Sequence, residues 1–229
     1  MAVRRGGRRE KVGKMRCYRR PQQRAGEKCG LVPLAVAFYA AMLVVAVAWR
    51  LWSDGQLPWF TGPGSAVLDG QLLLRHALLG LLAGAGLVLV SRLWTRFTRM
   101  GRGLARHLAE IIGPLSGAEV AVLALASGLG EEVFFRGALQ PRVGLVIASL
   151  LFGLAHLIPT RQLAPWAGFA ALAGVSLGAL FDYTGNLLAP VVAHVFVNGV
   201  NLRWLARSSL EGVGPRGHRD RNVSDRHRQ

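Results

Sequence analysis

The chain has few charged residues for its length and almost no cysteine. Of its 229 residues only 17% are charged, whereas 52% are hydrophobic. A composition this apolar is unusual for a soluble domain and favours a membrane protein. The two cysteines, Cys17 and Cys29, lie in a basic segment and their spacing matches no zinc motif. We therefore expect neither a disulfide framework nor a cysteine nucleophile.

Acidic residues are scarce, because 12 Asp and Glu stand against 28 Lys and Arg, which gives a formal net charge of +16. The basic residues lie in tails and short loops and not along a folded face, so no nucleic-acid partner is expected. Of the 28 basic residues, 24 fall in four segments: 1–30, 92–106, Arg161 and 203–229. With an even number of membrane crossings these segments share one side, which the positive-inside rule makes cytoplasmic.

Six stretches have about the length needed to cross a hydrocarbon core of about 30 Å. They are residues 31–49, 76–91, 111–142, 143–160, 162–181 and 183–202. Five of them carry no charge, and the stretch 111–142 reads as one long helix with ionisable groups at membrane depth. We predict an all-α fold, a polytopic transmembrane bundle of about six helices with both termini in the cytoplasm.

Four parts are predicted along the chain. They are a basic cytoplasmic tail (1–30), two N-terminal transmembrane helices with loops (31–110), a core of four transmembrane helices (111–207) and a basic polar tail (208–229). The tails lack apolar periodicity, so we expect them to be disordered or to lie against anionic lipid headgroups. A basic start before the first apolar run is also typical of a cleaved signal peptide, but the length of that run favours a retained helix.

The stretch GLGEEVFFRG, residues 128–137, places carboxylates and an arginine inside apolar sequence. Such groups are costly in hydrocarbon unless they are paired or face water, so they mark either a buried pair or a functional site. On a helix, Glu132 and Arg136 are four residues apart and can form an ion pair, while Glu131 points about 100° away. Taken alone, the motif is explained equally well by a structural salt bridge with a spare acid.

Two later motifs also place polar side chains four residues apart: Phe152 with His156, and His194 with Asn198. Measured along the helices from one membrane face, Glu131, His156 and His194 lie at depths of about 16, 18 and 12 Å. A lone histidine in a membrane helix is more often a packing group than a catalyst. An acid and two imidazoles at similar depth on three helices favour a shared site near the bilayer midplane.

These side chains are the parts of a peptide hydrolase. A carboxylate and an imidazole can activate a water molecule, and a second imidazole with a carboxamide can donate hydrogen bonds to an oxyanion. We predict no cofactor. A divalent metal such as zinc, held by Glu131, His156 and His194, is the alternative, although the chain has no HExxH motif. Serine and aspartyl intramembrane chemistries fit the sequence less well.

The three motifs, in this order on successive apolar segments, resemble those of the CPBP family of glutamic intramembrane proteases, which includes the type II CAAX prenyl endopeptidases. The resemblance covers about residues 119–205. It implies that Glu131 and His156 activate water and that His194 and Asn198 form the oxyanion hole. Glu132, Arg136 and Phe152 match motif positions and are expected to support the site.

The sequence thus predicts a multi-pass cell-membrane endopeptidase. The expected partners are the lipid bilayer and a membrane protein or peptide substrate, which the family resemblance associates with a C-terminal processing signal. Substrate identity and oligomeric state are left open. The alternative function is a non-catalytic membrane scaffold or small transporter with a polar intramembrane cavity.

Overall fold

The computed structural model describes residues 31–59, 70–158, 160 and 163–210, so the predicted tail 1–30 and most of the predicted tail 208–229 lie outside the described residues. The described residues form helices and no strand, which confirms the all-α fold class. The helices are α2 (Leu31–Asp54), α3 (Gly70–Phe97), α4 (Arg99–Ile112), α5 (Gly117–Glu132), the π-helix η1 (Val133–Leu139), α6 (Gln140–Ala155), α7 (Ala164–Thr184) and α8 (Leu188–Leu210).

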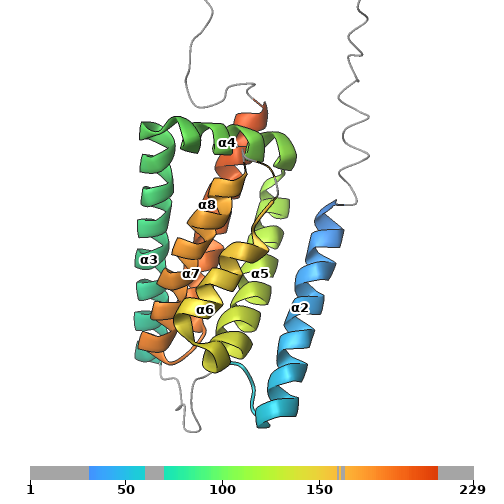
Figure 1. The fold of residues 1–229 in the computed structure, drawn as a ribbon, viewed down its shortest axis with the longest axis vertical. Helices are drawn as coiled ribbons and strands as arrows, with labels where there is room; N and C mark the ends of the chain where they lie inside the picture. The colour runs from blue at the N-terminus through green and yellow to red at the C-terminus, as the bar shows by residue number, and fades with distance from the viewer. Residues whose placement is uncertain (1–30, 60–69, 159, 161–162, 211–229) are drawn as a thin grey trace, which may run out of the picture.

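The long helices run roughly side by side along one axis, and α4 crosses them at one end (Figure 1). Helix α8 packs against α3, α4, α5 and α7, while α6 packs mainly against α7. Helix α2 stands at one edge, where it packs against α5 and η1. The described chain begins and ends at the end of the bundle where α4 lies, so its two ends share one side.

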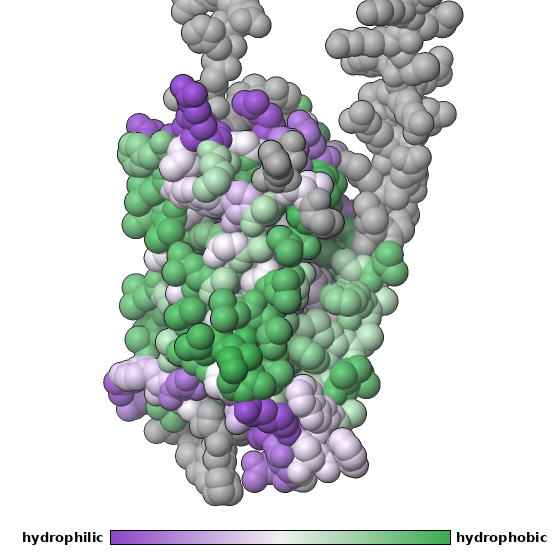
Figure 2. Space-filling view, viewed as in Figure 1, coloured by the Kyte–Doolittle hydropathy of each residue, from purple (hydrophilic) through white to green (hydrophobic). Residues whose placement is uncertain are grey.

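An apolar belt crosses the middle of the visible face of the molecule (Figure 2). Figure 2 shows hydrophobic residues across the central part of the visible face and hydrophilic residues gathered at both ends. Within the described residues, four helices are long and apolar enough to cross a membrane: Val32–Asp54, Gly70–Phe97, Gly117–Ala155 and Ala164–Thr184. Large aliphatic and aromatic side chains on these helices are exposed, as expected for surfaces that face lipid.

The helix Gly117–Ala155 is not a single straight crossing. Gly144 has φ 79° and ψ 167°, outside the helical region, and the helix is kinked there. The stretch 111–142, predicted as one helix, is also divided, because α4 ends at Ile112 and α5 begins at Gly117. The crossing predicted for 143–160 is shorter than expected: α6 ends at Ala155, only about 16 Å after the kink at Gly144.

Helix α4 was not predicted, because its arginines were interpreted as loop charge. It is amphipathic, with Leu104 and Ala109 buried and Arg106 exposed. Its first turn is capped by the Thr98 hydroxyl, which accepts a hydrogen bond from the Gly101 N–H at 2.9 Å. The helix therefore closes one end of the bundle with its apolar face inward and its basic face outward.

Helices α3 and α8 approach each other through glycines spaced four residues apart. A Cβ on Gly80 would lie 2.4 Å from the Ala189 carbonyl oxygen, and one on Gly84 would lie 2.9 Å from the Ala193 oxygen. Small residues at this spacing allow membrane helices to pack closely. The contact fixes α8, and with it the height of the polar side chains that α8 carries.

We expect Gly80→Val to destabilise the protein by about 1–3 kcal/mol, because the new side chain must push α3 away from α8. Gly86→Val on the same helix is the matched control, since a Cβ there meets nothing within 4 Å. Thermal unfolding in detergent measures both variants. Equal melting temperatures for the two would contradict this account of the α3–α8 contact.

Candidate active site

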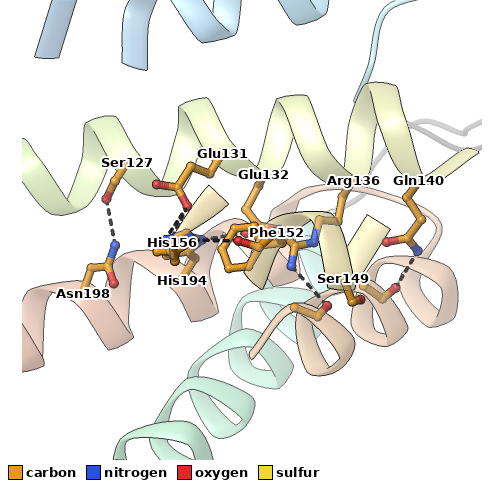
Figure 3. A network of polar contacts seen from close by, with 12 residues as sticks. Ser127, Glu131, Glu132, Arg136, Gln140, Ser149, Phe152, His156, His194 and Asn198 are labelled. Atoms are coloured by element: carbon orange, nitrogen blue, oxygen red, sulfur yellow. Dashed lines mark hydrogen bonds and ion pairs between the residues drawn. The ribbon is translucent and has the colours of Figure 1, made fainter. Parts of the chain in front are cut away.

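Two adjacent carboxylates lie where α5 passes into η1, and both are buried. Glu131 is 6% exposed and Glu132 is 0% exposed. Because successive residues of a helix point in different directions, the two acids meet different partners. Glu132 faces Arg136 and α8, whereas Glu131 faces the end of α6 and α8 (Figure 3).

Glu132 is held by two cationic or proton-bearing side chains. Its Oε1 accepts a hydrogen bond from Arg136 at 3.1 Å and lies 2.6 Å from His194 Nδ1. The Arg136 guanidinium also donates to the Gly174 carbonyl of α7 at 3.1 Å and lies 4.4 Å from the centre of the Phe152 ring. The predicted pairing of Glu132 with Arg136 is present, and it is fully buried.

Glu131 meets two imidazoles at one point. Its Oε2 is 3.7 Å from His156 Nε2 and 3.8 Å from His194 Nε2, and this oxygen has no hydrogen-bond partner. The three residues come from three different helical segments and were predicted to meet near the midplane of the membrane. The structure brings them together.

The hydrogen bonds of the two Nδ1 atoms determine which nitrogen of each imidazole carries the proton. His156 Nδ1 lies 2.8 Å from the Phe152 carbonyl oxygen, which can only accept, so Nδ1 carries the proton. His194 Nδ1 faces the Glu132 carboxylate and carries a proton for the same reason. When both rings are neutral, their Nε2 atoms are therefore acceptors. Three acceptors then face one another, an arrangement that requires a water molecule or an added proton between them.

The same hydrogen bond explains why α6 is short. Within a helix, the Phe152 carbonyl would accept the N–H of residue 156, but the His156 ring takes that place and the His156 backbone leaves the helical region at φ −93°, ψ 2°. His156 was predicted inside a long helix. It lies instead at the C-terminal end of α6, where its Nε2 reaches Glu131.

Asn198 lies one helical turn beyond His194 on α8. Its Nδ2 donates to the Ser127 hydroxyl at 2.8 Å, and that hydroxyl donates to the Ala124 carbonyl at 3.3 Å. Because a carboxamide nitrogen has two hydrogens, one N–H of Asn198 is left for another acceptor. Ser127 was not predicted as a member of the site, although it precedes Glu131 by four residues and so shares its helix face.

Aromatic rings pack around the His156 imidazole. The Phe152 ring centre is 4.6 Å and the Trp166 ring centre 5.3 Å from that of His156. Phe152 also contacts Phe135 edge-on at 4.9 Å. The predicted contact of Phe152 with His156 is present, whereas Trp166, on α7, was not predicted. The rings keep the imidazole in place and give this side of the site an apolar lining.

The predicted zinc ligands do not form a recognisable metal centre: among the residues that the structure describes, no group of three or more His, Cys, Asp or Glu side chains is arranged to hold a metal ion. Glu131, His156 and His194 do converge, so metal binding is addressed below by experiment.

Comparisons with known proteins identify the segment that carries these side chains. Residues 114–200 match the family model of the type II CAAX prenyl endopeptidase Rce1-like proteins, which confirms the family resemblance predicted from the motifs. An uncharacterised protein of Bacillus subtilis (strain 168), YpbD, is 39% identical over 80 residues. The aligned stretch covers 34% of this chain and 41% of YpbD, so less than half of that relative is matched. No solved structure matches the chain significantly.

We expect Arg136→Ala to destabilise the protein by about 3–5 kcal/mol, because it leaves the Glu132 carboxylate buried without its cation. Arg142→Ala is the control, since the ion pair of Arg142 with Asp54 is partly exposed and should contribute about 1 kcal/mol or less. Unfolding in detergent measures both. Adding Glu132→Gln to Arg136→Ala should recover part of the loss, and a further loss of stability would contradict this reading.

Proposed function

We propose that this chain, whose residues 114–200 match the Rce1-like type II CAAX prenyl endopeptidases, is an intramembrane endopeptidase that hydrolyses a peptide bond of a membrane-associated protein or peptide. The observation that carries the proposal is the meeting of one Glu131 oxygen with the Nε2 atoms of His156 and His194. The hydrogen bonds of the two Nδ1 atoms support the proposal, because they leave the Nε2 atom of each ring directed at this oxygen.

The first step is attack by water. A water molecule between Glu131 Oε2 and His156 Nε2 donates one O–H to each acceptor, which leaves a lone pair for the carbonyl carbon of the substrate. As the new C–O bond forms, the Glu131 carboxylate takes the proton and the carbonyl oxygen becomes an oxyanion. The water is thereby activated by two side chains that need no metal ion.

The second step is stabilisation of the oxyanion by His194 and Asn198. Because Nδ1 of His194 donates to Glu132, its Nε2 can donate only when the ring is protonated. The Glu132 carboxylate favours that charged form, which makes Glu132 a partner of the oxyanion hole as well as of Arg136. When the C–N bond breaks, the Glu131 carboxyl returns its proton to the leaving amine.

The substrate approaches from the side of His156. This side chain is 18% exposed, compared with 7% for those of Glu131 and His194. The apolar belt of Figure 2 suits a substrate that is itself held in the membrane, such as a protein with a C-terminal processing signal. We place the chain in the cell membrane as a multi-pass protein, with the basic end formed by α4 and the C-terminal part of α8 toward the cytoplasm.

Glu131→Gln should abolish cleavage, because an amide cannot take the proton of the attacking water. The matched control is Glu119→Gln on the same helix, where glutamine can still serve the capping interaction with Ser116. Both variants should accumulate in membranes and melt at similar temperatures. The measurement is the appearance of new N-termini in the membrane proteome of cells with the wild-type protein or either variant. Retained cleavage by purified Glu131→Gln would refute the proposed mechanism.

A chelator separates the two ways in which these residues could activate water. If Glu131 and His156 act directly, cleavage by the purified protein should be unchanged after treatment with a strong zinc chelator. If zinc activates the water, activity should disappear and return on addition of Zn²⁺. Measuring the metal content of the same samples links the result to the site.

A further inference from the structure

The N-terminal helix α2 lies outside residues 114–200 yet contacts the residue next to the proposed base. A Cβ on Gly130 would lie 2.8 Å from the Tyr39 carbonyl oxygen and 3.1 Å from the Tyr39 Cβ. Only a glycine allows this approach, so the backbone of α2 at Tyr39 is packed directly against the turn of α5 that carries Glu131. Helix α2 is thus fixed in height relative to the site.

The Tyr39 hydroxyl lies beside the Glu131 carboxylate, one residue from the contact of Tyr39 with Gly130. Tyr39 is half-buried, while its neighbour Phe38, whose ring it contacts edge-on at 5.3 Å, is 61% exposed on the outer face of α2. The phenol therefore points from the apolar surface of the bundle inward to the proposed base.

We propose that Tyr39 is a positioning residue, which donates a hydrogen bond to the Glu131 carboxylate and so aims its free oxygen at the imidazoles of His156 and His194. The inference rests on the proposed hydrolysis at Glu131. The imidazoles do not do the same: neutral His156 presents an acceptor at Nε2, and a proton on Nε2 of His194 serves the oxyanion of the substrate. A phenol is a donor that supports the carboxylate without competing for its proton.

The test is Tyr39→Phe, which removes the hydroxyl and keeps the ring. Because a hydrogen bond to a charged group is lost, we expect kcat to fall about tenfold or more, with KM within about twofold of wild type. Tyr183→Phe on α7 is the matched control, because Tyr183 is 71% exposed, and it should leave both constants unchanged. A fall in kcat without loss of thermal stability supports the proposal, and unchanged kcat overturns it.

A second variant disturbs the contact between Tyr39 and α5 by a change in α5. Gly130→Ala adds a methyl group where the α2 backbone lies and should separate Tyr39 from Glu131. The double variant Gly130→Ala/Tyr39→Phe should then be no slower than Gly130→Ala alone, because the hydroxyl no longer reaches its partner. Full additivity of the two effects would overturn the proposal.

An infrared measurement separates failure of this inference from failure of the proposed function. The carboxylate stretch of Glu131 is identified as the band lost in Glu131→Gln, and it should move in Tyr39→Phe but not in Tyr183→Phe. If the band moves and the wild-type protein cleaves nothing, the contact stands and the proposed hydrolysis falls. If wild type cleaves and the band does not move, the hydrolysis stands and the role of Tyr39 is refuted.

Discussion

One fully buried carboxylate, that of Glu132, connects the parts of the site. It binds Arg136 within η1 and His194 on α8, and Arg136 in turn donates to the Gly174 carbonyl of α7. Because water cannot replace a missing partner at 0% exposure, the three segments are held together as a unit. The His194 ring is oriented by this bond at Nδ1, which directs Nε2 to Glu131. The geometry around the proposed base thus depends on its neighbouring acid.

The charges of the cluster also constrain its chemistry. With Glu131 and Glu132 as carboxylates and Arg136 as a cation, the formal charge of the buried group is minus one while both imidazoles are neutral. In an apolar surrounding an uncompensated charge is costly, and one added proton removes it. That proton can lie on His194, between Glu132 and Glu131. A cluster that holds one extra proton has what is needed to stabilise an oxyanion, so electrostatic balance and the proposed catalysis favour the same protonation state.

Local spacing predicted the contacts within a helix, and it could not predict those between helices. The pair of Glu132 with Arg136 follows from a separation of four residues, whereas the bond of Glu132 to His194 joins residues 62 apart. No sequence pattern says which of two adjacent glutamates a distant helix meets. The π-helix η1 has no compositional signal either, since it arises from a change of hydrogen-bond register. For α4 the sequence did carry a signal, because its apolar and basic residues alternate with the period of a helix. The arginines were interpreted instead as charges of a loop.

The end of α6 meets two requirements at once: its last carbonyls need hydrogen-bond partners within the membrane, and the proposed hydrolysis needs an imidazole next to Glu131. Helices cross bilayers because all their backbone groups are satisfied internally, and a helix that ends at membrane depth needs other partners for its last carbonyls. The His156 ring supplies the partner of one such carbonyl, that of Phe152, and by doing so turns its Nε2 toward Glu131. Irregular backbone at this depth is tolerated where it is buried in protein or lines a wet cavity. The feature that makes α6 too short to cross is therefore the one that positions an imidazole for water.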